Sequence, residues 1–290
     1  MCGPVVMAAV RAEMNRRGLF GAAGATVLAG AVGGRSVSAA RQGATPVSGS
    51  SGTTGGTTTI AQFSSIVDLS HTITPDFPLF PGGTPFELTS LQTFEADGYY
   101  GNRIAVDEHT ATHMDAPAHF DPDGLTADRL PVAGFVAPLA VIDISGRAAN
   151  DSDAQVLPDD ILEWEAVNGS LPPGAFVAMF SAWESRLSDP TTYLNEGADG
   201  GFHYPGFHPD TAALLVAERD IVGIGVDTLS LDYGQSADFQ THLTVLPAGK
   251  YGIENLANLG DLPAAGATVI VGGPKHLNAS GGPARIFALV

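Results

Sequence analysis

Cysteine is nearly absent from this chain of 290 residues, which holds a single one, Cys2. One cysteine excludes an intramolecular disulfide and a cysteine-rich zinc module, and its position excludes a cysteine nucleophile in the folded body. Basic residues are also scarce, with 13 Lys and Arg against 31 Asp and Glu and a formal net charge of −18. Because so acidic a surface repels phosphate backbones, we expect no nucleic-acid partner.

Long apolar runs are missing as well. No stretch after the N-terminal segment reaches 18 apolar residues, so the sequence predicts no second membrane span. The chain also lacks the Gly-x-Ser-x-Gly elbow of serine hydrolases. A nucleotide site would rest on Gly223-Ile224-Gly225, which lacks the third glycine of the fingerprint. The hydrophobic content of 44% predicts an ordinary globular domain with a sizeable core.

Residues 1–40 are predicted to be an export signal. The pair Arg16-Arg17 precedes an apolar stretch from Gly21 to Gly34, which is shorter than the ~20 residues of a membrane span. Ser38-Ala39-Ala40 offers small residues for cleavage near Ala40. This pattern resembles a twin-arginine signal, so we expect passage through the export machinery to a periplasmic or extracellular location. An ordinary secretory signal and an uncleaved anchor are the alternatives.

The rest of the chain divides into a linker and a body. Residues 41–62 are rich in Gly, Ser and Thr and predict a flexible linker. Within the body, 63–290, strands are predicted at 65–69, 104–108, 139–144, 175–180, 221–226, 268–271 and 285–290. Helices are predicted at 158–167, 209–219 and 253–259, the first two starting at a proline followed by acidic residues. Apolar strands among helices indicate an α/β domain with a largely covered sheet.

The chemistry concentrates in His109-Thr110-Ala111-Thr112-His113-Met114-Asp115-Ala116-Pro117-Ala118-His119, which holds three of the chain's eight histidines. Imidazole with carboxylate suits zinc or manganese better than calcium or magnesium. A helical zinc-protease motif does not fit, because Thr110 stands where the general-base Glu is required. Pro117 also disfavours a helix through the segment. We therefore expect a strand leading into a loop from which these side chains converge.

A second group of polar residues lies downstream. Asp227-Thr228 ends the strand predicted at 221–226, and His242 precedes Glu254 by twelve residues. From spacing alone, each has an ordinary structural alternative, such as a helix cap for Glu254. The spacing therefore leaves open whether these residues are metal ligands.

The run from His109 to His119 resembles the signature His-x-Gly-Thr-His-x-Asp-x-Pro-x-His of the metal-dependent cyclase-like hydrolases, a family that includes bacterial arylformamidase (kynurenine formamidase) and isatin hydrolase. The resemblance covers residues 65–290 and extends to these further landmarks: Asp68-Leu69-Ser70, Phe80-Pro81-Gly82, Tyr204-Pro205-Gly206, Asp227-Thr228, His242 and Glu254-Asn255-Leu256. Ala111 replaces the family's glycine, and it would be strained if that position needs a positive φ.

The resemblance implies a role for each motif residue. Metal ligands would be His109, His113 and Asp115, with Asp115 able to bridge two ions, and His242 and Glu254 match the positions that hold a second zinc in the arylformamidase branch. The isatin branch uses one manganese, so we expect one or two divalent ions, zinc first and manganese as the alternative. His119 would transfer protons beside the metal. Asp107 and Glu108 are candidates, by proximity, for hydrogen bonds to ligand histidines.

The resemblance also implies a single α/β domain with a barrel-like mixed sheet and surrounding helices, assembled as a homodimer or higher homo-oligomer. The expected activity is that of a metal-dependent amidohydrolase cleaving a formamide, amide or lactam bond of a small aromatic substrate. Phe80 and Trp183 are candidates for substrate contact, with ordinary core packing as the alternative. A cyclase, an ester or lactone hydrolase, and a non-catalytic binding protein remain as alternatives. His119 favours an enzyme, because a binder needs no free histidine beside a complete ligand set.

Overall fold

A computed structural model describes residues 63–198 and 200–290. The predicted signal, 1–40, and the predicted linker, 41–62, lie outside the described residues. Within the described part of the chain, no helix has both the length and the apolar character that crossing a membrane requires.

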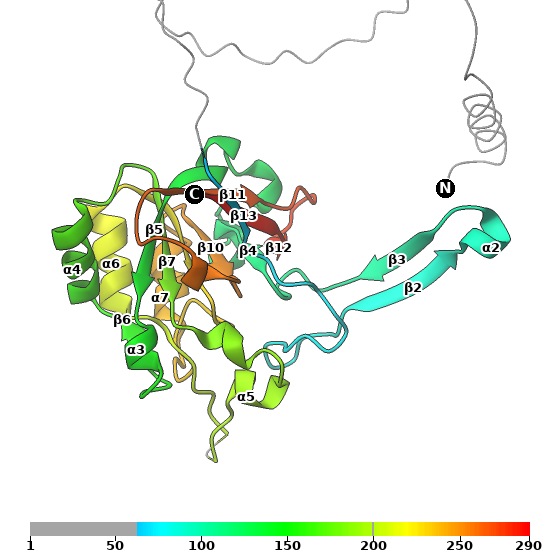
Figure 1. Ribbon diagram of the computed structural model, residues 1–290, viewed down its shortest axis with the longest axis horizontal. Coiled ribbons are helices and arrows are strands. Elements are labelled where there is room, and N and C mark those ends of the chain that lie inside the picture. Colours follow the sequence, from blue (N-terminus) through cyan, green and yellow to red (C-terminus); the bar gives the residue numbers. More distant parts are fainter. Residues whose placement is uncertain (1–62, 199) are drawn as a thin grey trace, which may run out of the picture. The chain divides into compact units, whose positions relative to one another are not determined.

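One curled mixed sheet of nine strands organises the domain into a half-barrel, in the order β1-β13-β11-β5-β7-β9-β10-β4-β12 (Figure 1). Its strands are β1 (Ile66–Asp68), β4 (His113–Asp115), β5 (Val136–Asp143), β7 (Ala175–Phe180), β9 (Ile221–Val226), β10 (Tyr251–Glu254), β11 (Ala267–Gly272), β12 (Gly281–Pro283) and β13 (Arg285–Leu289). The central strands β5, β7, β9 and β10 run parallel, and the outer strands pair antiparallel. The predicted single domain with a barrel-like mixed sheet is therefore confirmed.

Both faces of the central strands are buried. Along β7, Phe176 and Ala178 belong to one apolar cluster, whereas Val177 and Met179 belong to the other. This alternation follows from the two-residue period of a strand, and it explains why the run reads as continuously apolar. Helices α4 (Pro158–Asn168) and α6 (Pro209–Glu218) lie side by side against one face (Figure 1). Further helices are α3 (Ser145–Ala148), α5 (Pro190–Leu194) and α7 (Gln240–Val245), and β6 (Gln155–Val156) pairs with β8 (Gly206–Phe207) in a separate small sheet.

Most predicted elements are confirmed. The strands at 175–180 and 221–226 have the predicted bounds, and α4 and α6 begin at the predicted prolines. The helix predicted at 253–259 is wrong. Ile253 and Glu254 end strand β10, and a 3₁₀ turn follows only at Leu259–Asp261. A short apolar run fits either structure, and here pairing with β9 and β4 on both sides decides for the strand.

A β-hairpin stands apart from this sheet. It consists of β2 (Glu87–Gln92), α2 (Phe94–Asp97) and β3 (Gly101–Ala105), and it projects from the body (Figure 1). The strand predicted at 104–108 is thus shifted, because the chain leaves the hairpin after Ala105.

Candidate metal centre and active site

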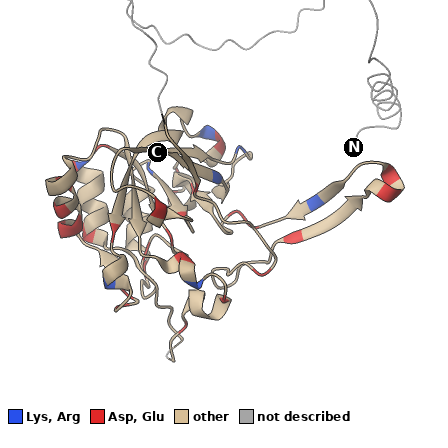
Figure 2. Cartoon of the chain, viewed as in Figure 1, with Lys and Arg blue, Asp and Glu red and all other residues tan. Residues whose placement is uncertain are grey.

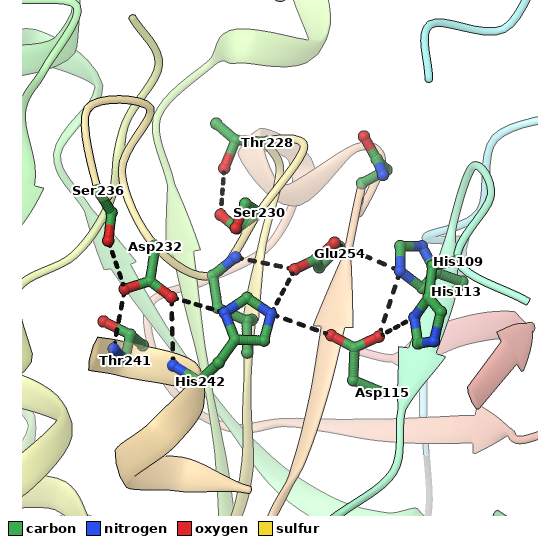
Figure 3. Close-up of polar contacts among 12 residues, drawn as sticks. His109, His113, Asp115, Thr228, Ser230, Asp232, Ser236, Thr241, His242 and Glu254 are labelled. Carbon is green, nitrogen blue, oxygen red and sulfur yellow. Dashed lines mark hydrogen bonds and ion pairs between the residues drawn. The ribbon is translucent and has the colours of Figure 1, made fainter. Parts of the chain in front are cut away.

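The candidate metal ligands meet where β4 lies beside β10 (Figure 3). Antiparallel pairing sets His113 of β4 directly opposite Glu254 of β10. Asp115 points to the same side as His113, because residues two apart in a strand share a face. His242 arrives from α7, and His109 from the loop before β4. The structure therefore brings together the five residues predicted as ligands.

The two carboxylates lie between the imidazoles. Asp115 Oδ1 is 2.6 Å from His109 Nδ1 and 3.3 Å from His113 Nε2, and its Oδ2 is 3.5 Å from His242 Nε2. Glu254 Oε2 is 3.3 Å from His113 Nε2, and its Oε1 is 3.1 Å from His242 Nε2. Each carboxylate thus turns one oxygen toward His113 and the other toward His242, as a ligand shared between two cations would.

The donor set fits a divalent cation. His113 Nε2 and Asp115 Oδ2 are buried and have no hydrogen-bond partner among the described residues, and their contacts with the other ligand side chains are ion pairs of 3.3–3.5 Å. Burial alone would lower the pKa of His113, but Asp115 and Glu254 raise that pKa to about 10. Such a concentration of negative charge in a dry site favours a cation. Ligand atoms of two overlapping triads, His109, His113 and Asp115, and Asp115, His119 and His242, lie within 4.8 Å of one another.

Hydrogen bonds orient two of the ligand imidazoles. His113 Nδ1 lies 2.8 Å from the carbonyl oxygen of Ala111, to which it donates when Nε2 is left free for a metal. His242 Nδ1 lies 2.6 Å from Asp232 Oδ2 in the same way. Partners of this kind orient the ring and make its free nitrogen a better ligand.

The third ligand imidazole is held through Ser280. His109 Nε2 is 2.9 Å from Ser280 Oγ, and that hydroxyl in turn donates to Glu108 Oε2. The sequence analysis named Asp107 and Glu108 as candidates for hydrogen bonds to ligand histidines. Glu108 contacts His109 indirectly, through the Ser280 hydroxyl. Asp107 instead accepts a hydrogen bond from the backbone N–H of Thr84.

Ala111 adopts a left-handed conformation with φ of 55°. The sequence analysis expected strain if this position needs a positive φ, and the observed φ makes alanine less favourable than glycine here by about 1–2 kcal/mol. The conformation turns its carbonyl oxygen toward both His113 Nδ1 and Asn255 Nδ2, the latter donating at 2.9 Å. Asn255 also accepts a 2.6 Å hydrogen bond from the hydroxyl of Tyr193. The strained turn therefore belongs to a buried network that holds a metal ligand.

His119 lines the cavity next to the ligands. Its ring stacks on that of His109 at 3.8 Å between centroids and lies 6.0 Å from the ring of His242. Burial lowers the pKa of His119 to about 4, so the imidazole is neutral at physiological pH. A neutral imidazole can accept a proton, and with Asp115 and His242 the same ring is also within reach of a metal.

An apolar cavity of about 250 Å³ opens above the ligands. Its aromatic walls are Phe80, Phe120 and Phe239, and the ring centroid of Phe239 lies 6.2 Å from that of Phe80 and 5.8 Å from that of Phe120. Phe80, for which the sequence predicted a substrate contact, thus lines the cavity. The structure does not bring Trp183 to this cavity: the side chain is 2% exposed, packs in an apolar cluster with Tyr193, and donates to the carbonyl oxygen of that residue.

Sequence reasoning missed several residues of the site. Asp232 and Ser280 orient ligand histidines, Asn255 holds the Ala111 turn, and Phe239 forms a wall. The signal that could have pointed to Asn255 is its position directly after Glu254. No spacing pointed to Ser280, which meets His109 across 171 positions.

Comparison with known proteins identifies the family. The cyclase family model matches residues 67–233. Isatin hydrolase of Roseibium aggregatum is 34% identical over 78% of this chain and 91% of its own length, and kynurenine formamidase of Paracidovorax citrulli is 26% identical over 75% and 93%. The solved structure of isatin hydrolase A from Labrenzia aggregata, bound to benzyl benzoate, superimposes with a TM-score of 0.74 at 38% identity, covering 78% of this chain and 93% of that one. With this match over more than half of its length, the chain belongs to the cyclase family.

Proposed function

We propose that this chain is a metal-dependent hydrolase that cleaves the carbon–nitrogen bond of a formamide, amide or lactam in a small aromatic substrate. The observation that carries the proposal is a buried set of histidines and carboxylates at the floor of a cavity walled by three phenylalanines. Two of its buried ligand atoms have no hydrogen-bond partner among the residues that the structure describes. The names of the two relatives, isatin hydrolase and kynurenine formamidase, support cleavage of a carbon–nitrogen bond.

The residues present would hold one or two ions. His109, His113 and Asp115 form one triad, and His242 faces the second oxygen of each shared carboxylate, Asp115 Oδ2 and Glu254 Oε1. When bound, a divalent ion polarises a carbonyl and lowers the pKa of coordinated water to about 7. Imidazole mixed with carboxylate is a typical zinc set, and we propose zinc, with manganese as the alternative.

His119 carries the proton. Its neutral ring faces the cavity beside the ligands, so it accepts a proton from the attacking water and returns it to the leaving nitrogen. The phenylalanine walls hold a flat ring over the ligands by edge and face contacts, and they exclude bulk water from the reacting carbonyl.

A hydrolysis screen with metal analysis tests the proposal. We expect the purified protein to contain close to one or two ions per chain and to open an aryl formamide or an isatin-like lactam faster than a matched simple aryl ester. Less than about a tenth of an ion per chain after growth with zinc and manganese would contradict the metal centre. Faster turnover of the ester would contradict the carbon–nitrogen specificity.

Two substitutions separate ligand from proton carrier. His113→Ala is expected to lose metal and activity together. His119→Ala is expected to keep its metal and lose about 10²–10⁴-fold in kcat, whereas a loss of metal would make His119 a ligand. His276→Ala, a change at an exposed histidine outside the cavity, serves as the matched control and should retain both.

We further propose that residues 1–40 direct export by the twin-arginine route and that the domain forms a homodimer or higher homo-oligomer. The paired arginines Arg16 and Arg17 support the export route. The conservative double change Arg16→Lys/Arg17→Lys should trap the precursor in the cytoplasm, and unchanged export would contradict this route.

A further inference from the structure

The buried carboxylate of Asp232, which is 2% exposed, fixes both ends of the loop that precedes α7 (Figure 3). Its Oδ1 accepts hydrogen bonds from the Ser236 hydroxyl at 3.2 Å and from the backbone N–H of Thr241 at 2.8 Å. Its Oδ2 accepts from the backbone N–H of His242 at 3.2 Å and lies 2.6 Å from Nδ1 of the same residue. One side chain therefore holds the loop, the start of α7 and a ligand imidazole together.

Phe239 lies in this loop in a strained backbone conformation. Its φ of 53° and ψ of 43° fall in the left-handed region, which is uncommon and unfavourable for a bulky side chain. Strained residues of this kind cluster at functional sites, where their surroundings hold them in place. Here the backbone N–H of Phe239 donates to Ser236 Oγ at 3.2 Å. The Ser236 hydroxyl thus accepts from the strained residue and donates to Asp232.

The strained conformation places the ring of Phe239 on the wall of the substrate cavity. The ring also stands edge-on to the imidazole of His242, with 6.0 Å between centroids and 85° between planes. Phe239 therefore meets this ligand imidazole in two ways, through its ring and through the hydrogen bonds of Ser236 and Asp232.

Ser236 separates two halves of the loop. The first half is tied to the body of the domain, because Gln235 Nε2 donates to the carbonyl oxygen of Phe202 at 2.9 Å. In the second half, residues 237 and 238 are exposed. Loss of the Ser236 hydroxyl would therefore act mainly on the half that carries Phe239.

We propose that Ser236 is a positioning residue that holds Phe239 against a flat substrate, and that a cation on His242 tightens this wall through Asp232. This inference rests on the metal-dependent hydrolase proposed above and names a residue that sets its preference for an aromatic ring. When His242 Nδ1 donates to Asp232, Nε2 is left free for the ion. Such a hydrogen bond strengthens a metal ligand, and by linkage the ion strengthens the hydrogen bond in return.

Indole is a suitable probe of this wall. It is flat, and it has neither a carbonyl to bind the ion nor an amide bond to hydrolyse. A cavity of about 150 Å³ holds benzene, so the cavity of about 250 Å³ can accept it. The chain has a net charge of −18, and its acidic residues are spread over the body (Figure 2). A neutral probe avoids direct attraction or repulsion by these charges and by the ion.

Calorimetry of the full chain, loaded with zinc or stripped by a chelator, measures the dissociation constant of indole. Loaded wild type is expected to bind indole about threefold to tenfold more tightly than stripped wild type, which is the effect of one hydrogen bond. Ser236→Ala should lose this difference, and Ser236→Thr, which keeps the hydroxyl, should restore it. The control Ser170→Ala changes an exposed serine outside the cavity and should match the wild type.

Three results would each overturn the proposal: equal indole affinity in loaded and stripped wild type, an undiminished difference in Ser236→Ala, or no recovery in Ser236→Thr. These affinities do not depend on turnover. A protein that takes up no zinc would overturn both this proposal and the hydrolase. A protein that binds zinc and indole as expected but hydrolyses no formamide would overturn only the hydrolase.

Steady-state kinetics provide a second readout. In Ser236→Ala, the KM for N-phenylformamide should rise about threefold to tenfold, with kcat and zinc content retained. The KM for N-butylformamide should not change, because an aliphatic chain makes no ring contact with Phe239. An equal rise for both formamides, or a fall in kcat without a change in KM, would overturn the positioning role.

Discussion

Replacing the buried carboxyl of Asp227 by an amide should remove a pH dependence from the stability of the fold. Asp227 follows β9, is 0% exposed, and accepts hydrogen bonds from the backbone N–H and hydroxyl of Ser181 and from the backbone N–H of Trp183. Burial raises the pKa of Asp227 from 3.8 to about 7. In Asp227→Asn, the amide oxygen can accept from the two N–H groups, and the amide nitrogen can donate to Ser181 Oγ, so the geometry is retained.

The sign follows from proton uptake. Between about pH 4 and 7, the folded protein keeps a proton on Asp227 that the unfolded chain releases, so the contribution to stability is complete below pH 4 and is lost as the pH rises through 7. Each pH unit over which only the unfolded chain releases the proton changes the free energy of unfolding by about 1.4 kcal/mol. Between pH 5 and 7.5 this span is about two units, so the wild type loses about 3 kcal/mol of stability. Because the amide does not titrate, the variant should gain that amount relative to the wild type over this range.

Thermal unfolding of both proteins at pH 5, 6 and 7.5 measures the effect. For a domain of this size, about 3 kcal/mol corresponds to a relative shift in Tm of roughly 6–12 °C. The metal ligands titrate equally in both proteins and cancel in the comparison. The control Asp151→Asn changes an exposed carboxylate and should follow the wild-type slope. A difference in Tm between variant and wild type that stays constant with pH would refute the reasoning.

Three further substitutions test the site and the core. Asp232→Asn removes the charge that orients His242 and should weaken metal affinity about 10–100-fold in a chelator competition; a change below about threefold would contradict that role. Gly225→Ala places a Cβ 2.7 Å from Phe176 Cζ, so denaturant unfolding should show a loss of about 1–3 kcal/mol, and an unchanged midpoint would refute the close packing. Phe239→Ala should raise KM for aromatic substrates with metal content unchanged, and an equal KM would remove Phe239 from the substrate wall.

Several features could be predicted from local sequence because local chemistry determines them. Proline at the first helical position places the starts of α4 and α6. The continuous apolar runs identify β7 and β9 as strands buried on both faces. The segment from His109 to His119 is dense enough in ligand side chains to indicate a metal site by itself.

Other features depend on contacts between distant positions. The run around Ile253 has no intrinsic preference strong enough to choose strand over helix, and its pairing with β9 and β4 decides. Local sequence also does not distinguish the positions of Phe239 and Trp183. The fold places Phe239 on the wall of the cavity and buries Trp183 away from it.

The sequence by itself determined the kind of chemistry, because imidazole and carboxylate groups within eleven residues have few uses other than holding a cation. Tertiary structure alone decided the shape of the site. Backbone pairing of β4 with β10 sets His113 opposite Glu254 across 141 positions, and packing brings Ser280 to His109. The physical reason is that the two kinds of interaction act over different distances along the chain. Propensity and spacing act over a few residues, whereas strand pairing and burial act between any segments that the folded chain brings into contact.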